Sequence, residues 1–317
     1  STHWIASAVG MSILEKGGNA FDAAVATGLV LQVLEPHLNG PAGDLPVIFH
    51  KAGTGETKVV CGQGPAPAGA TIDHYKAEGL DLIPGNGLLS TVIPGAFDGW
   101  MLMLRDHGTL SLRDVLEPAI YYAENGQPML PGAAATIGGL KDFFQTEWPT
   151  SFQTWVPGGN VPEAGEMFKN PVLAQTWTRL LSEAENQSGR EAQIDAARDC
   201  FYRGFIAEEI AAFLETAEVM DGSGTKHKGV LTADDLATWS ATYEDPLQSD
   251  YHDWTVAKTG PWGQGPVLLQ ALALLKGFDI GAMDPAGADF VHHVTEAMKL
   301  AYADREVYYG DPAFVDV

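Results

Sequence analysis

The chain has 317 residues, of which 45% are hydrophobic, so it is long enough to form one large or two ordinary globular domains. Its 41 acidic residues outnumber its 18 basic residues, and the formal net charge of −23 disfavours binding to nucleic acid or to anionic membrane surfaces. No apolar run approaches the roughly 18 residues that cross a bilayer, and no basic-then-apolar leader opens the chain. We therefore expect no membrane span and no retained export signal.

Cysteine usage limits the class of protein further. Cys61 and Cys200 are the only cysteines and lie far apart, which excludes a disulfide framework and a CxxC metal site. A reducing compartment is the default for such a chain, so a cytoplasmic location is favoured over a periplasmic or secreted one.

The first predicted elements are two helices followed by two strands. "HWIASAVGMSILEKGG" has apolar residues at helical spacing and stops at Gly17, where a left-handed cap suits glycine. Asn19 can cap a second helix, "AFDAAVATGLVLQVLEP", whose nearly continuous apolar character predicts burial on all sides. Extended runs at 47–49 and 58–61 flank "KAGTGET", whose glycines predict a hairpin turn rather than a phosphate loop.

The remaining elements are mostly helical. Ser111 is expected to cap a helix that ends at Gly126, and Thr232 to cap a short helix in "LTADDL". Residues 127–165, rich in glycine and proline, are expected to be irregular. The other expected elements are a strand at 254–258 and helices at 171–184, 203–217, 232–239, 266–276 and 287–309. No repeat or linker marks a second domain, so the sequence predicts one α+β domain over 1–317.

Common catalytic and cofactor motifs are missing from the chain. There is no GxSxG, HExxH, Walker lysine loop or GxGxxG after a strand. "GPWGQG" at 260–265 either lines a pocket or turns a corner. His292 and His293 are adjacent on a predicted helix and point about 100° apart, which disfavours joint metal ligation. His37 follows a buried helix and is either a satisfied structural histidine, which we favour, or a pocket wall. Asp234 and Asp235 are expected on a solvated helix face.

Several segments together resemble one family, the γ-glutamyltransferases. "ILEKGGNAFDAAVATGLVLQVLEPHLNG" resembles the KGGNAxDAAVA helix and VxEPHxxGxGG loop that open this family's large subunit. "VIPGAFDGWMLMLRDHGTLSLRDVLEPAIYYAENG", "FYRGFIAEEI" and "GVLTADDLATW" are similar to its middle part. "EAMKLAYADREVYYGDPAFVDV" is similar to its AxADR…GDPxFV stretch, so the resemblance covers nearly the whole chain.

The resemblance implies an N-terminal nucleophile hydrolase fold, a four-layer αββα sandwich shared between a large and a small subunit. Family members cut their own precursor, and the small subunit then begins with a threonine that serves as nucleophile and, through its amine, as base. This chain ends before such a threonine would follow, so we expect it to be the large subunit, to contain no catalytic residue, and to need neither cofactor nor metal. Its expected partners are the small subunit and a small-molecule amide or γ-glutamyl substrate.

The resemblance also assigns the substrate-binding candidates Gln63, Gly64 and Asp44. In "CGQGPAP", Gln63 stands where the family has an arginine whose planar fork binds the α-carboxylate of a glutamyl group. Glutamine can donate and accept a hydrogen bond but supplies no charge. In "GPAGDLPVIF", Asp44 stands where the family has a glycine or another small residue, and a carboxylate there would repel an anionic substrate.

Three functions stay open at this point. The first is a large subunit that helps to transfer or hydrolyse a γ-glutamyl or related acyl amide. The second is an acylase or small-amide hydrolase of the same family without γ-glutamyl specificity, which both substitutions favour. The third is a non-catalytic binding protein on this scaffold. A further alternative for Gln63 is that its side chain only satisfies loop backbone.

Overall fold

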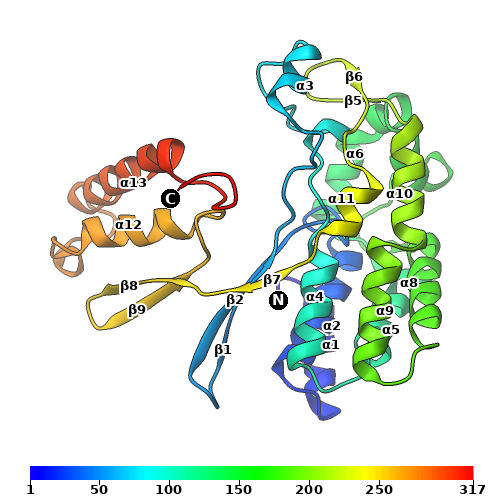
Figure 1. Ribbon diagram of the computed structural model, residues 1–317, viewed down its shortest axis with the longest axis horizontal. Coiled ribbons are helices and arrows are strands. Elements are labelled where there is room, and N and C mark those ends of the chain that lie inside the picture. The colour runs from blue at the N-terminus through cyan, green and yellow to red at the C-terminus, as the bar shows by residue number, and fades with distance from the viewer. Residues whose placement is uncertain (317) are drawn as a thin grey trace. The chain divides into compact units, whose positions relative to one another are not determined.

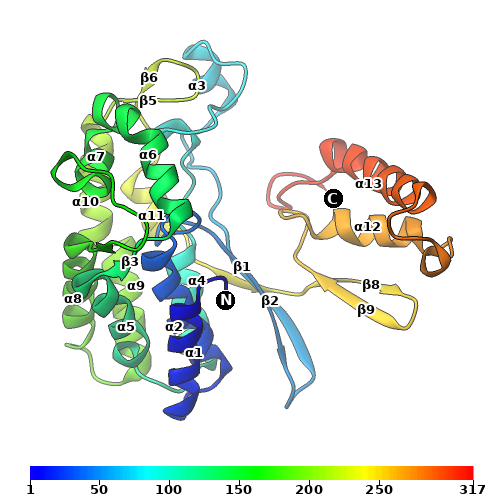
Figure 2. The same ribbon diagram turned by 180° about the vertical axis from the view of Figure 1, so that it is seen from behind.

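The computed structural model describes residues 1–316 and is shown from opposite sides in Figures 1 and 2. Its contacts divide the chain into two compact units. The first consists of Ser1–Leu45 and Gly62–Ala241, and the second of Pro46–Cys61 and the chain from Thr242 onward. The assignment of 1–317 to a single domain stays a prediction. Among the described residues, no helix is both long and apolar enough to cross a bilayer.

The first unit is built mainly of helices, with short antiparallel strand pairs β3–β4 and β5–β6. Its helices are α1 (Trp4–Glu15), α2 (Ala20–Leu34), α3 (Ile72–Ala77), α4 (Ala96–His107), α5 (Leu112–Asn125), α6 (Pro131–Thr146), α7 (Pro149–Trp155), α8 (Pro171–Ala184), α9 (Arg190–Tyr202), α10 (Phe205–Thr216) and α11 (Ala233–Thr238), with 3-10 turns η1 (Leu88–Ser90) and η2 (Pro157–Gly159). Its strands are β3 (Gln127–Pro128), β4 (Met167–Phe168), β5 (Val219–Met220) and β6 (Lys226–His227).

The second unit contains the longer strands and two helices. Its three-stranded sheet has the order β1-β2-β7, and a separate hairpin pairs β8 with β9. Its elements are β1 (Leu45–Lys51), β2 (Glu56–Gly62), β7 (Thr242–Glu244), β8 (Leu247–Tyr251), β9 (Trp254–Lys258), α12 (Gly265–Leu275), η3 (Ile280–Ala282) and α13 (Ala288–Tyr308). Leu45 and Gly62, the first residue of β1 and the last of β2, belong to the first unit. The predicted hairpin and the α+β mixture are therefore confirmed.

The predicted helix boundaries hold where capping chemistry marks them. Gly17 has a φ of 91° just after α1, as a left-handed cap requires. Asn19, Ser111 and Thr232 cap α2, α5 and α11, each in a reciprocal capping box with an aspartate three residues on. α2 is buried on nearly all sides, as its apolar sequence predicts.

The expectation of an irregular segment at 127–165 is wrong, because α6 and α7 occupy much of it. Both helices begin with a proline at the first helical position, where its missing N–H costs nothing and its fixed φ favours the helix. Ala133 and Ile137 of α6 pack with Met129, Val156 and Phe168 in a buried cluster. Tertiary packing therefore overrides the low helix propensity of the glycines in α6. Helix α9, which the sequence analysis missed, likewise buries one face.

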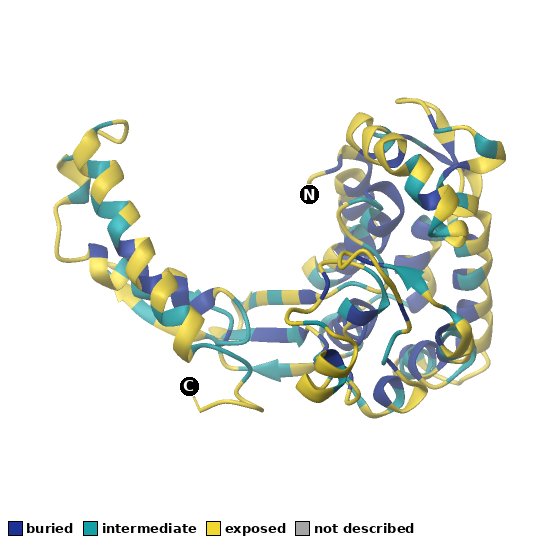
Figure 3. Cartoon of the chain, turned by 90° about the horizontal axis from the view of Figure 1, so that it is seen from above, coloured by how far each residue is buried: buried dark blue, intermediate teal, exposed yellow. Residues whose placement is uncertain are grey.

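The core of the first unit lies between its helices, where the buried residues gather in Figure 3. Phe97 of α4 stacks on Trp177 of α8 and Phe201 of α9, with ring centroids 5.4 and 4.7 Å apart. All three rings are at most 3% exposed. Large buried aromatic rings dominate core energetics, so this stack fixes α4 against α8 and α9.

Asp22 connects the start of α2 to the turn between α4 and α5. Its carboxylate accepts hydrogen bonds from Asn19 N at 2.8 Å, from Thr109 N and Oγ1 at 2.9 and 2.8 Å, and from Leu110 N at 3.1 Å. The side chain is fully buried. Burial by itself would raise the pKa of Asp22, but these hydrogen bonds prevail and hold it below its ordinary value.

We predict that Asp22→Ala lowers the free energy of unfolding by about 2 kcal/mol or more, because it leaves several buried N–H groups without an acceptor. Urea unfolding of the protein expressed from its complete gene measures this loss. The matched control is Asp114→Ala, since Asp114 holds the same capping-box position at the exposed start of α5 and should cost about 1 kcal/mol.

The same contact predicts a pH dependence. A depressed folded-state pKa contributes stability that is present above the unfolded pKa of about 3.9 and is lost as the pH falls through the folded pKa. The difference in unfolding free energy between the natural protein and Asp22→Asn should therefore shrink in acid. A difference that stays constant across this range would contradict the assignment.

Candidate functional site

Three segments of the first unit meet where β1 begins and β2 ends. The carbonyl oxygen of Gly43 accepts hydrogen bonds from Gly95 N and Ala96 N, both at 2.9 Å, at the start of α4. Ile93 N donates to Pro65 O at 3.0 Å, which joins the segment before α4 to the loop after β2. These bonds hold residues 40–45, 62–67 and 93–96 together as one backbone cluster, which we call the loop junction.

Glycines allow the three segments to approach this closely. A Cβ atom on Gly64 would lie 1.9 Å from Ile93 O, and one on Gly95 would lie 2.0 Å from Gly62 O. A Cβ atom on Gly62 would lie 2.9 Å from Leu45 O. Real Cβ atoms do not approach backbone oxygens so closely, so the loop junction requires glycine at these positions and has little freedom to move.

The junction brings Gln63 and Asp44 to the same place. Gly62, which precedes Gln63, lies against Leu45, which follows Asp44. Both side chains are exposed, whereas Gly64 is buried. Within residues 1–316 neither Gln63 nor Asp44 makes a side-chain hydrogen bond or ion pair, so Gln63 does not satisfy loop backbone there. A fixed backbone thus presents an unpaired amide and a carboxylate to the solvent.

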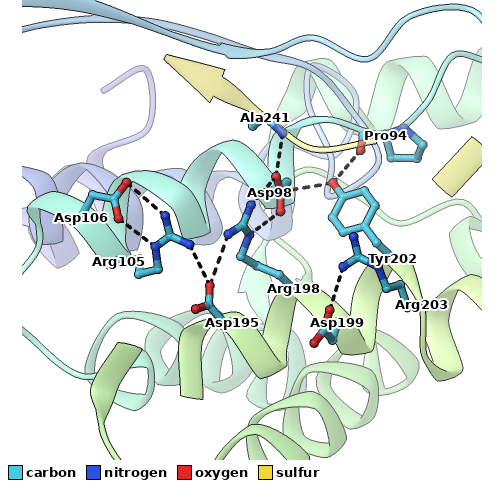
Figure 4. Close-up of polar contacts among 10 residues, drawn as sticks. All are labelled: Pro94, Asp98, Arg105, Asp106, Asp195, Arg198, Asp199, Tyr202, Arg203 and Ala241. Carbon is cyan, nitrogen blue, oxygen red and sulfur yellow. Dashed lines mark hydrogen bonds and ion pairs between the residues drawn. The ribbon is translucent and has the colours of Figure 1, made fainter. Parts of the chain in front are cut away.

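A buried network of hydrogen bonds and ion pairs holds the start of α4, which is part of the loop junction (Figure 4). Arg198 of α9 forms a two-point ion pair with Asp98 of α4, with N–O distances of 2.6 and 2.9 Å. The amide of Ala241 donates to the same carboxylate at 2.7 Å. Tyr202 donates its hydroxyl proton to Pro94 O at 2.6 Å and accepts a hydrogen bond from Asp98 N at 3.2 Å.

Arg198 and Tyr202 keep their protons across the physiological pH range. Hydrogen bonds to Asp98 raise the pKa of the Arg198 guanidinium, and burial raises the pKa of the Tyr202 hydroxyl, which therefore remains a donor. Asp195 accepts from Arg198 and from Arg105, which extends the network to the surface along α9 and α4. Arg198 therefore stays a cation and Tyr202 stays a donor near neutral pH, and we call the contacts among Asp98, Arg198 and Tyr202 the clamp.

A second anchor holds the far end of the loop after β2. Asp235 accepts a hydrogen bond from Ala68 N at 2.9 Å and another from Thr232 N, which completes the capping box of α11. Burial would raise the pKa of Asp235, but the hydrogen bonds from Ala68 and Thr232 outweigh it and lower the pKa. The side chain is only 8% exposed, so the expectation of a solvated helix face is wrong for Asp235.

The other sequence candidates lie elsewhere. His37 lines an apolar cavity with Ile137 and Phe144, and its Nδ1 has no hydrogen-bond partner within the described residues. The interpretation that we favoured, a structural histidine whose hydrogen bonds are all satisfied, is therefore wrong. The alternative, that His37 forms part of a pocket wall, is confirmed. His292 is exposed on α13, beside the half-buried His293, which contacts Asp289 O. In residues 1–316 no group of three or more His, Cys, Asp or Glu side chains is arranged to hold a metal ion.

The loop at 260–265 turns the chain between β9 and α12. Trp262 donates its indole N–H to Glu244 at 2.7 Å, and a Cβ atom on Gly265 would lie 2.0 Å from Thr259 O. The sequence left open whether this loop lines a pocket or turns a corner, and these contacts indicate that it turns a corner.

Comparison with known proteins identifies the family. A family model described as Gamma-glutamyltranspeptidase matches residues 6–317. The chain belongs to this family. Its relatives are enzymes of the N-terminal nucleophile hydrolase class, and the predicted fold class is therefore confirmed.

The individual relatives differ in their named activities. A Bacillus subtilis protein named glutathione hydrolase-like YwrD proenzyme is 34% identical over 100% of this chain and 56% of its own length. The solved structure of LmbA2991HD is 53% identical, with a TM-score of 0.93 over 98% of this chain and 53% of its own. The cephalosporin acylase from Bacillus halodurans is 33% identical, with a TM-score of 0.85 over 99% and 55%. The chain thus spans about half the length of these relatives.

We predict that Gly64→Ala disrupts the loop junction, because the added methyl group meets backbone rather than a movable side chain. Overpacking of this kind costs about 1–3 kcal/mol or more in unfolding free energy. Thermal unfolding measures the effect. Gly85→Ala is the matched control, since a Cβ atom there has nothing within 4 Å; equal losses in both variants would refute the tight approach at Gly64.

Arg198→Met should lower the free energy of unfolding by about 3–5 kcal/mol, because it leaves the buried Asp98 carboxylate without a counter-charge. Chemical denaturation measures the loss. Arg203 pairs with Asp199 on the exposed side of the same helix, and Arg203→Met should cost at most about 1 kcal/mol. Equal stability of the two variants would contradict the expectation that the buried Asp98–Arg198 pair contributes more than an exposed pair.

Proposed function

We propose that the chain is the large subunit of an amide-cleaving acyl-transfer enzyme of this family. In this proposal one precursor cuts itself, and the new N-terminal threonine of the small subunit attacks the amide carbonyl of the substrate. The threonine's own amine accepts the hydroxyl proton and passes it to the leaving amine, and the acyl group stays on the threonine oxygen. Water or a second amine then attacks the ester carbonyl and releases the acyl group. The family match and the proenzyme relatives support this division of labour.

The contribution of this chain is to recognise the acyl group. The observation that carries this role is the exposed Gln63 side chain, which has no partner within residues 1–316, on a backbone locked by Gly64 and Gly95. Because the backbone is already fixed, only the side-chain rotamers of Gln63 are ordered when it binds a ligand. Gln63 can donate one hydrogen bond and accept another, and Gly64 keeps the backbone beneath it in place.

The charge at the junction favours a second candidate, an acylase or small-amide hydrolase without γ-glutamyl specificity. Gln63 supplies no cation for a substrate carboxylate, and the exposed Asp44 beside it adds a negative charge. Hydrogen bonds to charged groups contribute about 1.5–3 kcal/mol, against about 1 kcal/mol for neutral ones, so an anionic donor loses roughly ten-fold in binding. A neutral acyl group meets no such penalty, and one relative is named a cephalosporin acylase.

The second unit supports the proposal of a partner chain. The 21-residue helix α13 buries only Ala297 and Ala301 among its described residues. Large apolar side chains of α13, among them Val291, Leu300 and Val307, are 54–71% exposed. Exposed apolar surface of this kind marks an interface, and we propose that the small subunit covers it. We propose neither nucleic acid nor a membrane as a partner, since the net charge of −23 repels both.

We predict that Gln63→Arg raises kcat/KM for a γ-glutamyl anilide by about ten-fold, because the guanidinium supplies the charge that a carboxylate needs. The same variant should lose activity or stay unchanged on an anilide of a neutral acyl group. The assay compares both anilides with the processed enzyme expressed from the complete gene.

Ala66→Arg is the control for charge alone, since Ala66 is exposed three residues further along the same loop. Asp44→Asn should also raise the activity on the γ-glutamyl anilide relative to the neutral anilide, as Gln63→Arg does. If Gln63→Arg leaves the ratio of the two activities unchanged, or Ala66→Arg changes it equally, Gln63 does not select the acyl group.

A further inference from the structure

A cavity of about 220 Å³ lies in the first unit, and Gln63, Gly64 and Asp44 are not among the residues that line it. Its wall includes the second half of α2, the loop after it, the β3–β4 pair and the start of α8. The volume is several times the roughly 30 Å³ that one water occupies in the liquid, so the cavity can hold a larger molecule. The residues that matter for its chemistry are Gln32, Asn39, Gln127, Trp155, Phe168 and Asn170.

Two of these residues carry buried polar atoms without partners. Gln127 is 1% exposed, and neither its Oε1 nor its Nε2 has a hydrogen-bond partner within the described residues. Gln32 is 5% exposed, and its Oε1 is also without a partner there. Buried side-chain amides nearly always have partners, because an unpaired one costs free energy comparable to a lost hydrogen bond. Both glutamines line the same cavity, where a bound molecule can supply the missing partners.

The wall determines which chemical group fits. Among the described residues that line the cavity none is charged, so an ion would find no counter-charge. Gln127 offers a donor and an acceptor side by side, and the complement of that pair is another amide, which accepts and donates in return. Trp155 and Phe168 stack with ring centroids 5.6 Å apart and provide an apolar surface beside the glutamines.

Other polar residues on the wall are already engaged. Asn170 accepts a hydrogen bond from Leu173 N as the cap of α8, and Asn39 donates to Glu35 O. Asn39 is exposed, so the cavity opens to solvent beside it. Pro41, also on the wall, is two residues from Gly43, whose carbonyl is held in the loop junction. A bound molecule would therefore support the back of the loop that carries Asp44.

We propose that this cavity, which we call the glutamine cavity, binds an uncharged small molecule through a carboxamide group. The carboxamide oxygen accepts from Gln127 Nε2, and its N–H₂ donates to Gln127 Oε1 or Gln32 Oε1. The apolar remainder of the molecule packs on Trp155 and Phe168. Gln63, Gly64 and Asp44 are not part of this site, and the proposal does not depend on the proposed enzymatic activity.

Binding to the processed protein, expressed from its complete gene, tests the proposal without an activity assay. Benzamide is the probe, with acetophenone and benzoate as controls that keep the ring but lose the amide donor or add a charge. Benzamide should raise the melting temperature in a saturable way, whereas the controls should not. A crystal soaked with benzamide should show its amide against Gln127.

Variants make the outcome specific. Gln127→Met keeps the side-chain length but removes both amide atoms, and it should abolish the benzamide shift without destabilising the unliganded protein. Gln32→Met should weaken the shift and serves if Gln127→Met fails to fold. Gln175→Met, on the exposed face of α8, should leave the shift unchanged. The proposal is overturned if the cavity holds only ordered water, if benzamide binds at crystal concentration only, or if all three probes behave alike.

Discussion

The rest of the candidate site depends on one constraint, the contact of backbone on backbone where Gly62 and Gly64 pass the segment from Ile93 to Gly95. No side chain fits between them, so the end of β2 has one position relative to the start of α4. The first amides of α4 bind Gly43 O, which adds the third segment to the same cluster. The positions of Gln63 and Asp44 follow from backbone geometry and not from contacts of their own side chains.

The loop junction keeps its geometry only because other contacts hold α4 in place. The stack of Phe97, Trp177 and Phe201 fixes the helix laterally, and the buried pair of Asp98 with Arg198 fixes its first turn. Breaking a buried pair is costly because one charge stays behind without compensation. Raised pKa values keep Arg198 charged and Tyr202 protonated near neutral pH, so both stay donors to the clamp.

Features that depend on contacts between neighbouring residues could be predicted from the sequence, whereas features that depend on contacts between distant residues could not. Asn19, Ser111 and Thr232 mark helix starts because capping is chemistry between neighbours, and the hairpin glycines mark a turn for the same reason. The helices that begin at Pro131 and Pro149 could not be predicted, because residues 127–165 have low helix propensity. A buried cluster formed with residues further along the chain stabilises α6. For the site, family resemblance drew attention to Gln63, Gly64 and Asp44. The clamp of Asp98, Arg198 and Tyr202 gave no comparable signal, because Asp98 lies 100 and 104 residues before its two partners in the sequence. The one available indication was an aspartate in the first turn of an apolar helix.

In our proposal this chain positions the substrate while a second chain from the same precursor carries the nucleophile. An intact-mass spectrum of the protein expressed from its complete gene, recorded before and after incubation with an electrophilic acyl probe, tests it directly. We predict two polypeptides, the smaller beginning with threonine, and an added acyl mass on the smaller one alone. A single uncut chain, a smaller chain that begins with a residue other than threonine, serine or cysteine, or acylation of the large chain would contradict the claim. The first two of these outcomes would favour a binding protein on this scaffold.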